Sequence, residues 1–443
     1  MPIRLEPSAR SIAAHVVERV EREGAFAAAV LDAAVERFAE LDPRERALAT
    51  EIAYGALRTA PYLTERLARH AVHGARSLEG TVRAHLIVAG YQLLFLERVP
   101  AFAAVSEAVR LVTAVRGKRV GAFANAVLRR LAAEATGDKR AALEDATRAS
   151  VAPALWVSLV RSLGEPGAAA FIGATSAPAV GLRIRVGEDR DAWLARLRAH
   201  APRATFAPGT VSPLSILMRG GGDPQKLPSF RAGELTIQEE GAQVVALALG
   251  AKAGEIVLDA CAGRGNKTAL LAELVGASGA VDAADQHPSK LARLQAELLR
   301  MRLAPRATYA VDWTIGQGDV PADYDRVLVD APCSGTGTIR RRPELGARWE
   351  AAKLPELGVL QLHILLAAAE RVKPGGIVVY AVCSVLREEC EDVIAEALRR
   401  VPWLAPVPLV GERVPLLSGA TAFRLTPYEH GTDGFFLAAL ERR

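Results

Sequence analysis

Two cysteines, Cys333 and Cys383, occupy positions where a thiol can act as a nucleophile. Each follows a short apolar run: VLVDAPCSGTG spans residues 327–337, and IVVYAVCS spans residues 377–384. The thiolate is the reactive form of cysteine, whereas a single buried cysteine is usually inert packing. Two cysteines at the ends of neighbouring strands, one of them after an Asp-Ala-Pro sequence that begins at Asp330, favour chemistry over packing.

A glycine-rich turn, CAGRGNKT at residues 261–268, follows the strand EIVLDA. Gly263 and Gly265 permit positive φ and allow backbone amides to approach a ligand closely. The next strand ends at Asp285, placed to accept hydrogen bonds from the ribose of an adenosine, and the third ends at Asp312, placed to meet the adenine amine. S-adenosylmethionine (SAM) suits this set because it carries ribose and adenine but no phosphate. The predicted cofactor residues are Cys261, Ala262, Gly263, Arg264, Gly265, Asn266, Lys267, Asp285, Asp312 and Asp330.

Three other interpretations of this turn compete with SAM binding. A phosphate-binding P-loop requires glycine directly before Lys-Thr, where this chain has Asn266, and an earlier glycine where it has Cys261. A dinucleotide fingerprint requires a third glycine at the position of Thr268, which argues against hydride transfer. A glycine-rich turn without a ligand stays open from the loop alone, although acids at two further strand ends argue against it.

These residues come together only if several strands end at one edge of a sheet. From about residue 236, five apolar runs (EIVLDA, AVDAAD, ATYAVD, DRVLVDA and GIVVYAV) alternate with helical segments, which predicts a parallel sheet with helices on both faces. Ligands of such sheets bind at the carboxyl ends of the strands. Two further strands, AFRLTP and DGFFLAALER, form a terminal hairpin. This seven-stranded, Rossmann-like α/β pattern is typical of class I SAM-dependent methyltransferases.

The chain before this sheet divides into two further regions. Residues 1–140 are predicted to form an all-α domain, because apolar residues in segments such as SIAAHVVERV recur at helical spacing. The polar segment at residues 135–150, ATGDKRAALEDATRAS, is expected to be a linker. Residues 150–235 combine a strand, PAVGLRIRV, with a helix, DAWLARLRAH, and predict a small α/β subdomain. Residues 236–443 then form the catalytic domain.

Composition narrows the class of protein. The 443 residues are 50% hydrophobic and 24% charged, and no apolar run approaches the roughly 18 residues that span a bilayer. No signal peptide is evident at the start, so we expect a cytoplasmic protein with reduced cysteines. The cysteines lack CxxC spacing, so no metal site is predicted. Cys390, in an acidic segment, and Cys261, beside the glycine turn, are interpreted as packing residues.

The net charge of +5 is modest, but basic residues are unevenly distributed. Eight basic residues and only two acidic ones lie between positions 110 and 140, and Arg340, Arg341 and Arg342 follow the PCSGTG turn. Each cluster is either a solvated face or a set of phosphate contacts.

Four motifs resemble those of the RNA cytosine-C5 methyltransferases: DAPCSGTG, YAVCS, CAGRGNKT and DGFFLAALER. The segments ERALATEIAYGALR, VPAFAAVSEAVRLV and GAFANAVLRRL resemble the NusB-like RNA-binding domain fused to one branch, the bacterial 16S rRNA enzymes of the Fmu/Sun (RsmB) type. The resemblance covers nearly the whole chain. The family loop is closer to CAAPGGKT, so Arg264 and Asn266 are unusual, and Val382 stands where threonine is common.

The resemblance implies a mechanism that forms 5-methylcytosine. The family assigns the nucleophile to Cys383, which adds to C6 of cytosine so that C5 attacks the methyl group of SAM. Asp330 would hold the N3 and N4 edge of the base, and Cys333 would assist release of the methylated adduct. The base must be unstacked, so the expected partner is RNA, namely 16S rRNA before or during small-subunit assembly. A monomer without membrane contact is expected.

Three other functions are also compatible with the sequence. A DNA-type cytosine methyltransferase would use the cysteine after the fourth strand, Cys333, as its nucleophile. A non-catalytic RNA-binding assembly factor would carry a cofactor loop that binds nothing. Methylation of another RNA, such as tRNA, would use the same chemistry on a different substrate.

Overall fold

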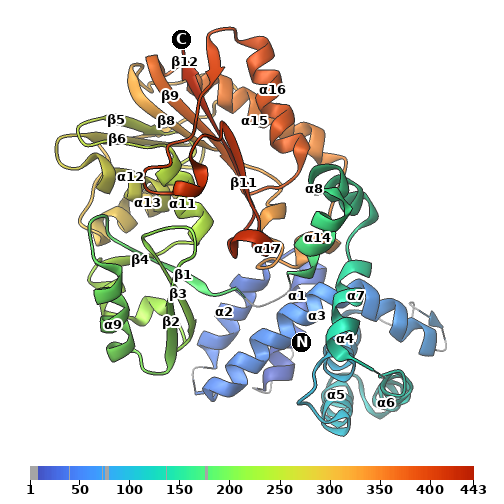
Figure 1. The fold of residues 1–443 in the computed structure, drawn as a ribbon. Helices are drawn as coiled ribbons and strands as arrows, with labels where there is room; N and C mark the ends of the chain where they lie inside the picture. Colours follow the sequence, from blue (N-terminus) through green and yellow to red (C-terminus); the bar gives the residue numbers. More distant parts are fainter. Residues whose placement is uncertain (1–7, 39, 72, 75–78, 136, 175–177) are drawn as a thin grey trace. The chain divides into compact units, whose positions relative to one another are not determined.

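The computed structural model describes residues 8–38, 40–71, 73–74, 79–135, 137–174 and 178–443. Contacts divide the chain into two compact units, whose elements are labelled in Figure 1. The helical unit consists of Met1–Val157, Pro166–Ala177 and Ile339–Trp349. The α/β unit consists of Ser158–Glu165, Pro178–Thr338 and Glu350–Arg443.

The α/β unit is built on an eight-stranded sheet. Its order is β10 (Leu404–Pro406), β12 (Phe435–Arg442), β9 (Val372–Val382), β8 (Tyr324–Asp330), β5 (Ile256–Asp259), β6 (Ala280–Asp285) and β7 (Ala307–Ala310), with β11 (Ala422–Leu425) also pairing with β12. Strands β5 to β9 pair in parallel, and β12 pairs antiparallel with β9, β10 and β11. The predicted parallel sheet with its terminal hairpin is confirmed. The additional strand β10 went unpredicted because three residues are too short to show a period.

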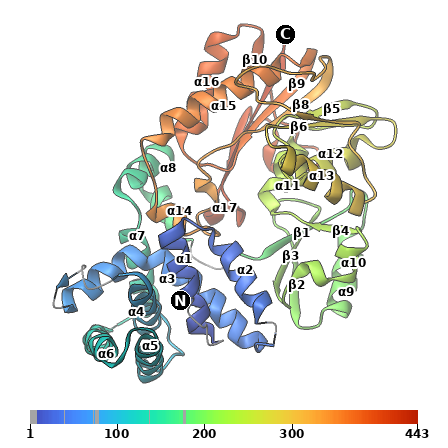
Figure 2. The same ribbon diagram turned by 180° about the vertical axis from the view of Figure 1, so that it is seen from behind.

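Helices cover both faces of this sheet, as the two opposite views show (Figures 1 and 2). They are α11 (Glu240–Ala248), α12 (Asn266–Val275), α13 (Pro288–Arg300), α15 (Lys353–Ala369) and α16 (Glu391–Arg400), whereas the short α17 (Pro427–His430) follows β11 and has no buried residue. Leu328 and Val379 lie in one core with α11 and α12. Their neighbours Val327 and Val378 lie in another core with α15 and α16. Because both faces are buried there, the central residues of these strands, Val327–Val329 and Ile377–Val382, are almost entirely apolar.

A smaller antiparallel sheet belongs to the same unit. Its order is β2 (Ala204–Pro208), β3 (Ser215–Gly220), β1 (Val180–Ile184) and β4 (Leu235–Ile237), and α9 (Arg190–His200) and α10 (Pro228–Arg231) accompany it. Its apolar residues share one core with α11 and α12. Arg183 of β1 is fully buried and donates to Glu273 of α12 at 2.8 Å. The small sheet is therefore tied to the large one, and the division into three domains stays a prediction.

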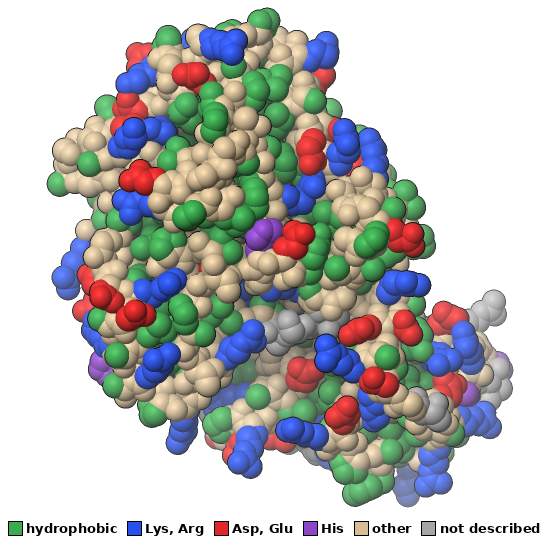
Figure 3. All heavy atoms as spheres, viewed as in Figure 1, with side chains coloured by type: hydrophobic (Ala, Val, Ile, Leu, Met, Phe, Trp, Pro, Cys, Tyr) green, Lys and Arg blue, Asp and Glu red, His purple; other side chains and the backbone are tan. Residues whose placement is uncertain are grey.

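The helical unit contains α1 (Ala9–Glu23), α2 (Ala27–Arg37), α3 (Pro43–His70), α4 (Gly80–Phe95), α5 (Ala101–Arg116), α6 (Lys118–Ala132) and α7 (Lys139–Ala149). Lys and Arg side chains lie over its surface among acidic ones (Figure 3). A further helix, α8 (Pro153–Gly173), is bent at Gly164, where φ is +71°, and contributes to both units. None of the described helices is both long and apolar enough to cross a membrane.

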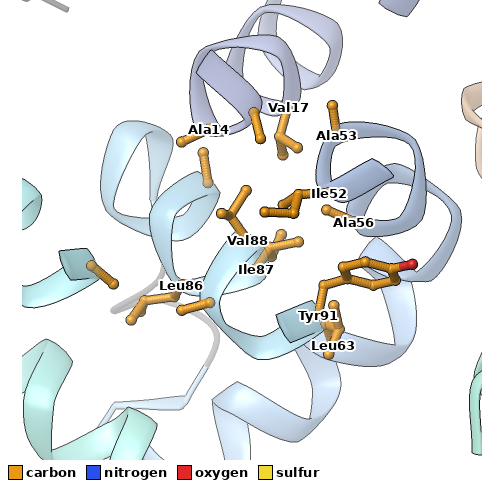
Figure 4. Packing of buried hydrophobic residues seen from close by; sticks show 14 of the residues in the cluster. Ala14, Val17, Ile52, Ala53, Ala56, Leu63, Leu86, Ile87, Val88 and Tyr91 are labelled. Carbon is orange, nitrogen blue, oxygen red and sulfur yellow. The ribbon is translucent and has the colours of Figure 1, made fainter. Parts of the chain in front are cut away.

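Helix α4 forms the centre of the helical unit. Its residues from Thr81 to Phe95 are buried apart from Arg83, as expected of a helix surrounded by other helices. Figure 4 shows Ile87 and Tyr91 of α4 among side chains of α1 and α3. Gly55 of α3 makes this packing possible, because a Cβ there would lie 2.0 Å from Tyr91 Cζ.

The predicted linker at residues 135–150 is wrong, because most of it forms helix α7. The Asp138 side chain caps this helix by accepting from the backbone N–H groups of Arg140 and Ala141. Ala146 is buried in the core of the helical unit, and Ser150 accepts from the backbone N–H of Tyr62 at 3.3 Å. The few apolar residues of this segment are too sparse to reveal the periodicity of a helix.

The segment Ile339–Trp349, with the short helix α14 (Glu344–Ala347), joins the helical unit although it follows strand β8 in sequence. The Arg58 guanidinium donates to the carbonyl of Arg340 at 3.3 Å, and the backbone N–H of Ala152 donates to the carbonyl of Gly346 at 3.1 Å. The Arg342 guanidinium lies 5.6 Å from the centre of the Phe26 ring. The helical unit is therefore completed by residues far along the chain.

Acid should destabilise the helical unit through His85 of α4. This side chain is buried, and burial lowers its pKa from 6.5 to about 4. The unfolded chain therefore binds a proton between about pH 6.5 and pH 4 that the folded protein does not, so stability falls as pH falls through this window. His85→Leu should reduce the loss of unfolding free energy between pH 7 and pH 4 by about 3 kcal/mol.

Urea unfolding of the full chain at several pH values measures this difference. His73→Leu, at an exposed position, is the matched control and should follow the wild-type pH dependence. Equal pH dependences for His85→Leu and the wild type would contradict the prediction.

Candidate active site

The glycine turn lies directly after β5. Gly263 and Gly265 have φ of +55° and +90°, in the left-handed region that glycine adopts without strain. Gly265 is also the residue before α12, and a Cβ there would lie 2.7 Å from Leu294 Cγ of α13. At Gly263, by contrast, a Cβ would meet nothing nearer than the carbonyl oxygen of Cys261 at 4.0 Å. The turn is thus packed underneath and open at Gly263.

Asp285, at the end of β6, contacts this turn. Its Oδ2 accepts from the backbone N–H of Gly263 at 3.1 Å, and its Oδ1 accepts from the backbone N–H of His287 at 2.8 Å. Asp312 follows β7, one strand further out. Its Oδ1 accepts from the backbone N–H and the hydroxyl of Thr314, and this hydroxyl contact lowers the Asp312 pKa. The structure joins Asp285 to the turn and places Asp312 at the same sheet edge.

The two unusual loop residues differ in environment. Arg264 is exposed. Asn266 begins α12, and its side-chain amide donates to the carbonyl of Ile237 in β4 at 3.2 Å. The amide of Asn266 therefore anchors α12 to the small sheet, a role that the sequence did not indicate. The first two residues of the turn, Cys261 and Ala262, pack against apolar side chains. The backbone N–H of Ala262 donates to the carbonyl of Ala284 at 2.9 Å.

Lys267 and Asp330 form an ion pair across the site. Lys267 Nζ lies 2.5 Å from Asp330 Oδ2, and both side chains are largely buried. Burial alone would lower the Lys267 pKa, but the charge of Asp330 and the hydrogen bond to it outweigh burial and raise that pKa. The charge of Lys267 is thus committed to Asp330, whereas Arg264 of the same loop is exposed. Lys267 is therefore not available to pair with a phosphate, which fits an adenosine bound by backbone amides and carboxylates.

The two predicted thiols lie side by side. Cys333 Sγ and Cys383 Sγ are 3.2 Å apart, at the ends of the neighbouring parallel strands β8 and β9. The backbone N–H of Gly337 donates to the carbonyl of Cys383 at 3.0 Å, and the N–H of Gly434 donates to the carbonyl of Gly337 at 2.8 Å. The segments that follow β8 and β9, and the residue before β12, are therefore held at one point.

The four thiols differ in what their surroundings allow. The hydrogen bond with Cys383, followed by burial, raises the pKa of Cys333 well above its ordinary value. One thiol of the pair can therefore stay protonated and donate a hydrogen bond to the other sulfur. Burial raises the pKa values of Cys261 and Cys390 as well, and Cys390 is completely buried. The raised pKa values keep both thiols protonated, and the complete burial of Cys390 agrees with its interpretation as a packing residue.

Two buried carboxylates beneath the site were not identified from the sequence. Asp259 ends β5, accepts from the Thr268 hydroxyl at 2.7 Å, and has its pKa raised to about 6 by burial. Glu389 precedes α16 and accepts hydrogen bonds from both thiol-bearing segments. Asp259 could have been identified from the sequence, because it is the acidic residue at the end of the apolar strand that precedes the glycine turn. Glu389 sits in the acidic sequence REECED, where nothing distinguishes it from solvent-exposed neighbours.

The described residues contain no group of three or more His, Cys, Asp or Glu side chains arranged to hold a metal ion. The site therefore consists of the open glycine turn with Asp285, the Lys267–Asp330 pair and the two thiols. Backbone amides and carboxylates suit a nucleoside ligand, and a paired thiol suits covalent addition to an electron-poor carbon.

Comparisons with known proteins identify relatives of both regions. Residues 246–441 match the family described as 16S rRNA methyltransferase RsmB/F, and residues 7–133 match the NusB family. The chain is 33% identical to ribosomal RNA small subunit methyltransferase B of Vibrio cholerae, over 91% of each chain. It is 32% identical to the protein of the same name from Erwinia tasmaniensis, over 98% of each chain. The solved structure of PH0851 matches 99% of this chain with a TM-score of 0.81 at 24% identity, which shows a shared fold.

Gly337→Ala should open the junction between the two thiol-bearing segments. A Cβ at this position would lie 1.9 Å from the carbonyl oxygen of Gly434, so the backbone must move. We expect a loss of about 1–3 kcal/mol in unfolding free energy, as for overpacked sites. Gly346→Ala is the control, because its Cβ would meet only Ile339 Cγ2 at 3.9 Å. Calorimetric melting curves that shift equally for both variants would contradict the prediction.

Proposed function

Because the chain belongs to the family described as 16S rRNA methyltransferase RsmB/F and is a SAM-dependent RNA methyltransferase, we propose that it methylates C5 of a cytosine in 16S rRNA. The family resemblance seen in the sequence is confirmed. The observation that carries the choice of cytosine C5 is the pair of thiols 3.2 Å apart at the ends of β8 and β9. Methylation of an exocyclic amine or a ribose would not require a paired thiol.

The cytosine ring must be activated because its C5 is a poor nucleophile. In the proposed reaction the Cys383 thiolate adds to C6, which turns C5 into an enamine-like carbon. Asp330, with its charge balanced by Lys267, accepts hydrogen bonds from the protonated N3 and N4 edge of the base. SAM, when bound, supplies an electrophilic methyl group. The C5 proton then leaves to solvent, its electron pair forms the C5–C6 double bond, and the C6–S bond breaks with its electron pair returning to the Cys383 sulfur, which releases the product.

Cys333 is placed to assist this release. Its sulfur lies within hydrogen-bonding distance of the Cys383 sulfur, and its raised pKa keeps it protonated at neutral pH. A thiol that donates to the departing sulfur stabilises the thiolate that forms as the C6–S bond breaks. This division of roles follows the family pattern, in which the fifth strand end supplies the nucleophile. The DNA-type order would exchange the two cysteines.

SAM is assigned to the carboxyl ends of β5 and β6. The amides of the turn from Cys261 to Lys267, open at Gly263, would meet the ligand, and Asp285 would accept from its ribose. Asp312 would meet the adenine amine from the end of β7. Asp330 is assigned to both the cofactor and the base. The backbone amides of the turn, together with the carboxylates of Asp285 and Asp312, support the assignment of an adenosine ligand.

The helical unit is proposed to hold the RNA. Lys118, Arg119 and Arg129 are exposed on α6, where they can contact phosphates. Lys139, predicted with them, instead donates to the carbonyls of Leu93 and Leu96 at the end of α4, at 3.0 and 2.8 Å. We assign RNA binding to residues 1–140, an RNA-binding and linking role to 150–235, and catalysis to 236–443. The protein would act as a cytoplasmic monomer before or during small-subunit assembly.

The roles of the thiols are tested by comparing three alanine variants. Cys383→Ala should abolish methyl transfer, because no C6 adduct can form. Cys333→Ala should allow methylation but accumulate protein covalently joined to RNA, seen as a slow, nuclease-sensitive and SAM-dependent band on a denaturing gel. Cys390→Ala, the packing control, should form no such band. If Cys383→Ala stays active while Cys333→Ala is inactive without an adduct, the nucleophile is Cys333.

The cofactor assignment is tested at Asp285. Asp285→Ala removes an acceptor from the proposed ribose contact and from the Gly263 amide, so SAM binding should weaken by about 1.5–3 kcal/mol. Isothermal titration calorimetry measures the affinity, and Asp319→Ala, at an exposed position of the same unit, is the control. Unchanged affinity in Asp285→Ala would refute the assignment.

A further inference from the structure

Glu389 presents an unusual carboxylate beneath the thiols. Its side chain is completely buried. Oε1 accepts from the backbone N–H of Ser334 at 2.8 Å and from Gln361 Nε2 at 3.0 Å. Oε2 accepts from the hydroxyls of Ser334 and Ser384, both at 2.5 Å. Burying a carboxylate without donors is strongly unfavourable, and these four neutral donors stabilise both of its oxygens.

The donors come from the two segments that carry the thiols. Ser334 directly follows Cys333, and Ser384 directly follows Cys383. Gln361 of α15 also donates to the carbonyl of the residue before Cys333 at 3.0 Å. One carboxylate therefore restrains the Cys333 segment directly at the residue after the thiol and, through the amide of Gln361, at the residue before it. It restrains the second segment one residue beyond Cys383.

The carboxylate itself is fixed relative to the sheet. The Tyr380 hydroxyl of β9 donates to the backbone carbonyl of Glu389 at 2.7 Å, and the backbone N–H of Glu389 donates to the carbonyl of Leu386 at 3.0 Å. Removing the carboxylate would leave the backbone N–H of Ser334 without its acceptor, while the Ser334 hydroxyl could still donate to Thr336 Oγ1 at 3.2 Å. Buried donors without partners are unfavourable, so the segment would shift to find others.

We propose that Glu389 is a positioning residue that sets the separation of the Cys333 and Cys383 sulfurs and thereby controls release of the methylated adduct. Addition to C6 uses the sulfur of Cys383 alone, whereas release uses both sulfurs within hydrogen-bonding distance. Disturbing their separation therefore slows release before it slows attack. The role in turnover rests on the proposed function, but the separation of the thiols is a property of the folded chain that needs no activity.

The separation is measured chemically with diamide, which takes up two hydrogens as the two thiols join in a disulfide. The rate of Cys333–Cys383 disulfide formation is followed by peptide mass mapping of the full chain. In Glu389→Gln, an NH2 group takes the place of one acceptor oxygen. This group cannot accept from the donors of Ser334, Ser384 or Gln361, so the Cys333 and Cys383 segments should move apart. We expect disulfide formation to slow about tenfold or more, since such reactions depend steeply on the placement of the reacting atoms.

Glu388→Gln is the matched control, because it removes the same charge one residue away. The carboxylate of Glu388 pairs with Arg161 at 3.2 Å and takes no part in the contacts with the thiol segments described above. This variant should form the disulfide within about twofold of the wild-type rate. If Glu389→Gln also reacts within that range, the proposal is overturned.

Turnover provides a second readout that a purely structural role would not change. Glu389→Gln should bind SAM with wild-type affinity and keep its KM for RNA, while kcat falls and a SAM-dependent protein–RNA adduct accumulates. Glu388→Gln should show neither change. A fall in kcat without any adduct would overturn the link to release. If the wild-type protein itself methylates no cytosine, the proposed function fails, while the diamide rates still decide the role of Glu389.

Should Glu389→Gln fail to fold, as judged by circular dichroism, Ser334→Ala and Ser384→Ala take its place. Each removes one hydroxyl donor and keeps the carboxylate, so a smaller slowing of about two- to fivefold is expected. Disulfide formation at the wild-type rate in both variants would overturn the proposal.

Discussion

The parallel pairing of β8 with β9 is the constraint on which the site depends. Its register sets Asp330 opposite Ala381, so the residues after each strand leave the sheet at the same edge. A slip of one residue would turn every side chain of a strand to the other face and separate the thiols. Burial of both strand faces in different cores makes such a slip very unfavourable. The chemistry is therefore positioned by apolar residues that take no part in it.

Three carboxylates lie close to this edge, and each is stabilised differently. Asp330 is paired with a lysine, Glu389 with four neutral donors, and Asp259 with the Thr268 hydroxyl and the backbone N–H of Cys261. The least satisfied of them, Asp259, is the one whose pKa rises to about 6.

Features that depend on neighbours in sequence could be predicted, whereas pairings between distant residues could not. Apolar runs that end in Asp285, Asp330 or the segment of Cys383 revealed both the sheet and most of its functional edge. The ion pair of Lys267 with Asp330 was hidden, because the two residues lie 63 positions apart in the sequence. Glu389 was hidden because an acid in an acidic helix start normally faces water. Helix α7 was not predicted, because its buried side consists mainly of small residues.

The segment Ile339–Trp349 belongs to the helical unit, yet the chain enters it from Thr338 and leaves it into Glu350 of the α/β unit. The helical unit is accordingly not a module that a single recombination point could transfer between relatives. In a chimera that exchanged residues 1–157 alone, the new residues at positions 26, 58 and 152 would have to contact the unexchanged segment Ile339–Trp349 in place of Phe26, Arg58 and Ala152. In this chain, a substitution on one side of these contacts is therefore constrained by residues on the other side that lie far away in the sequence.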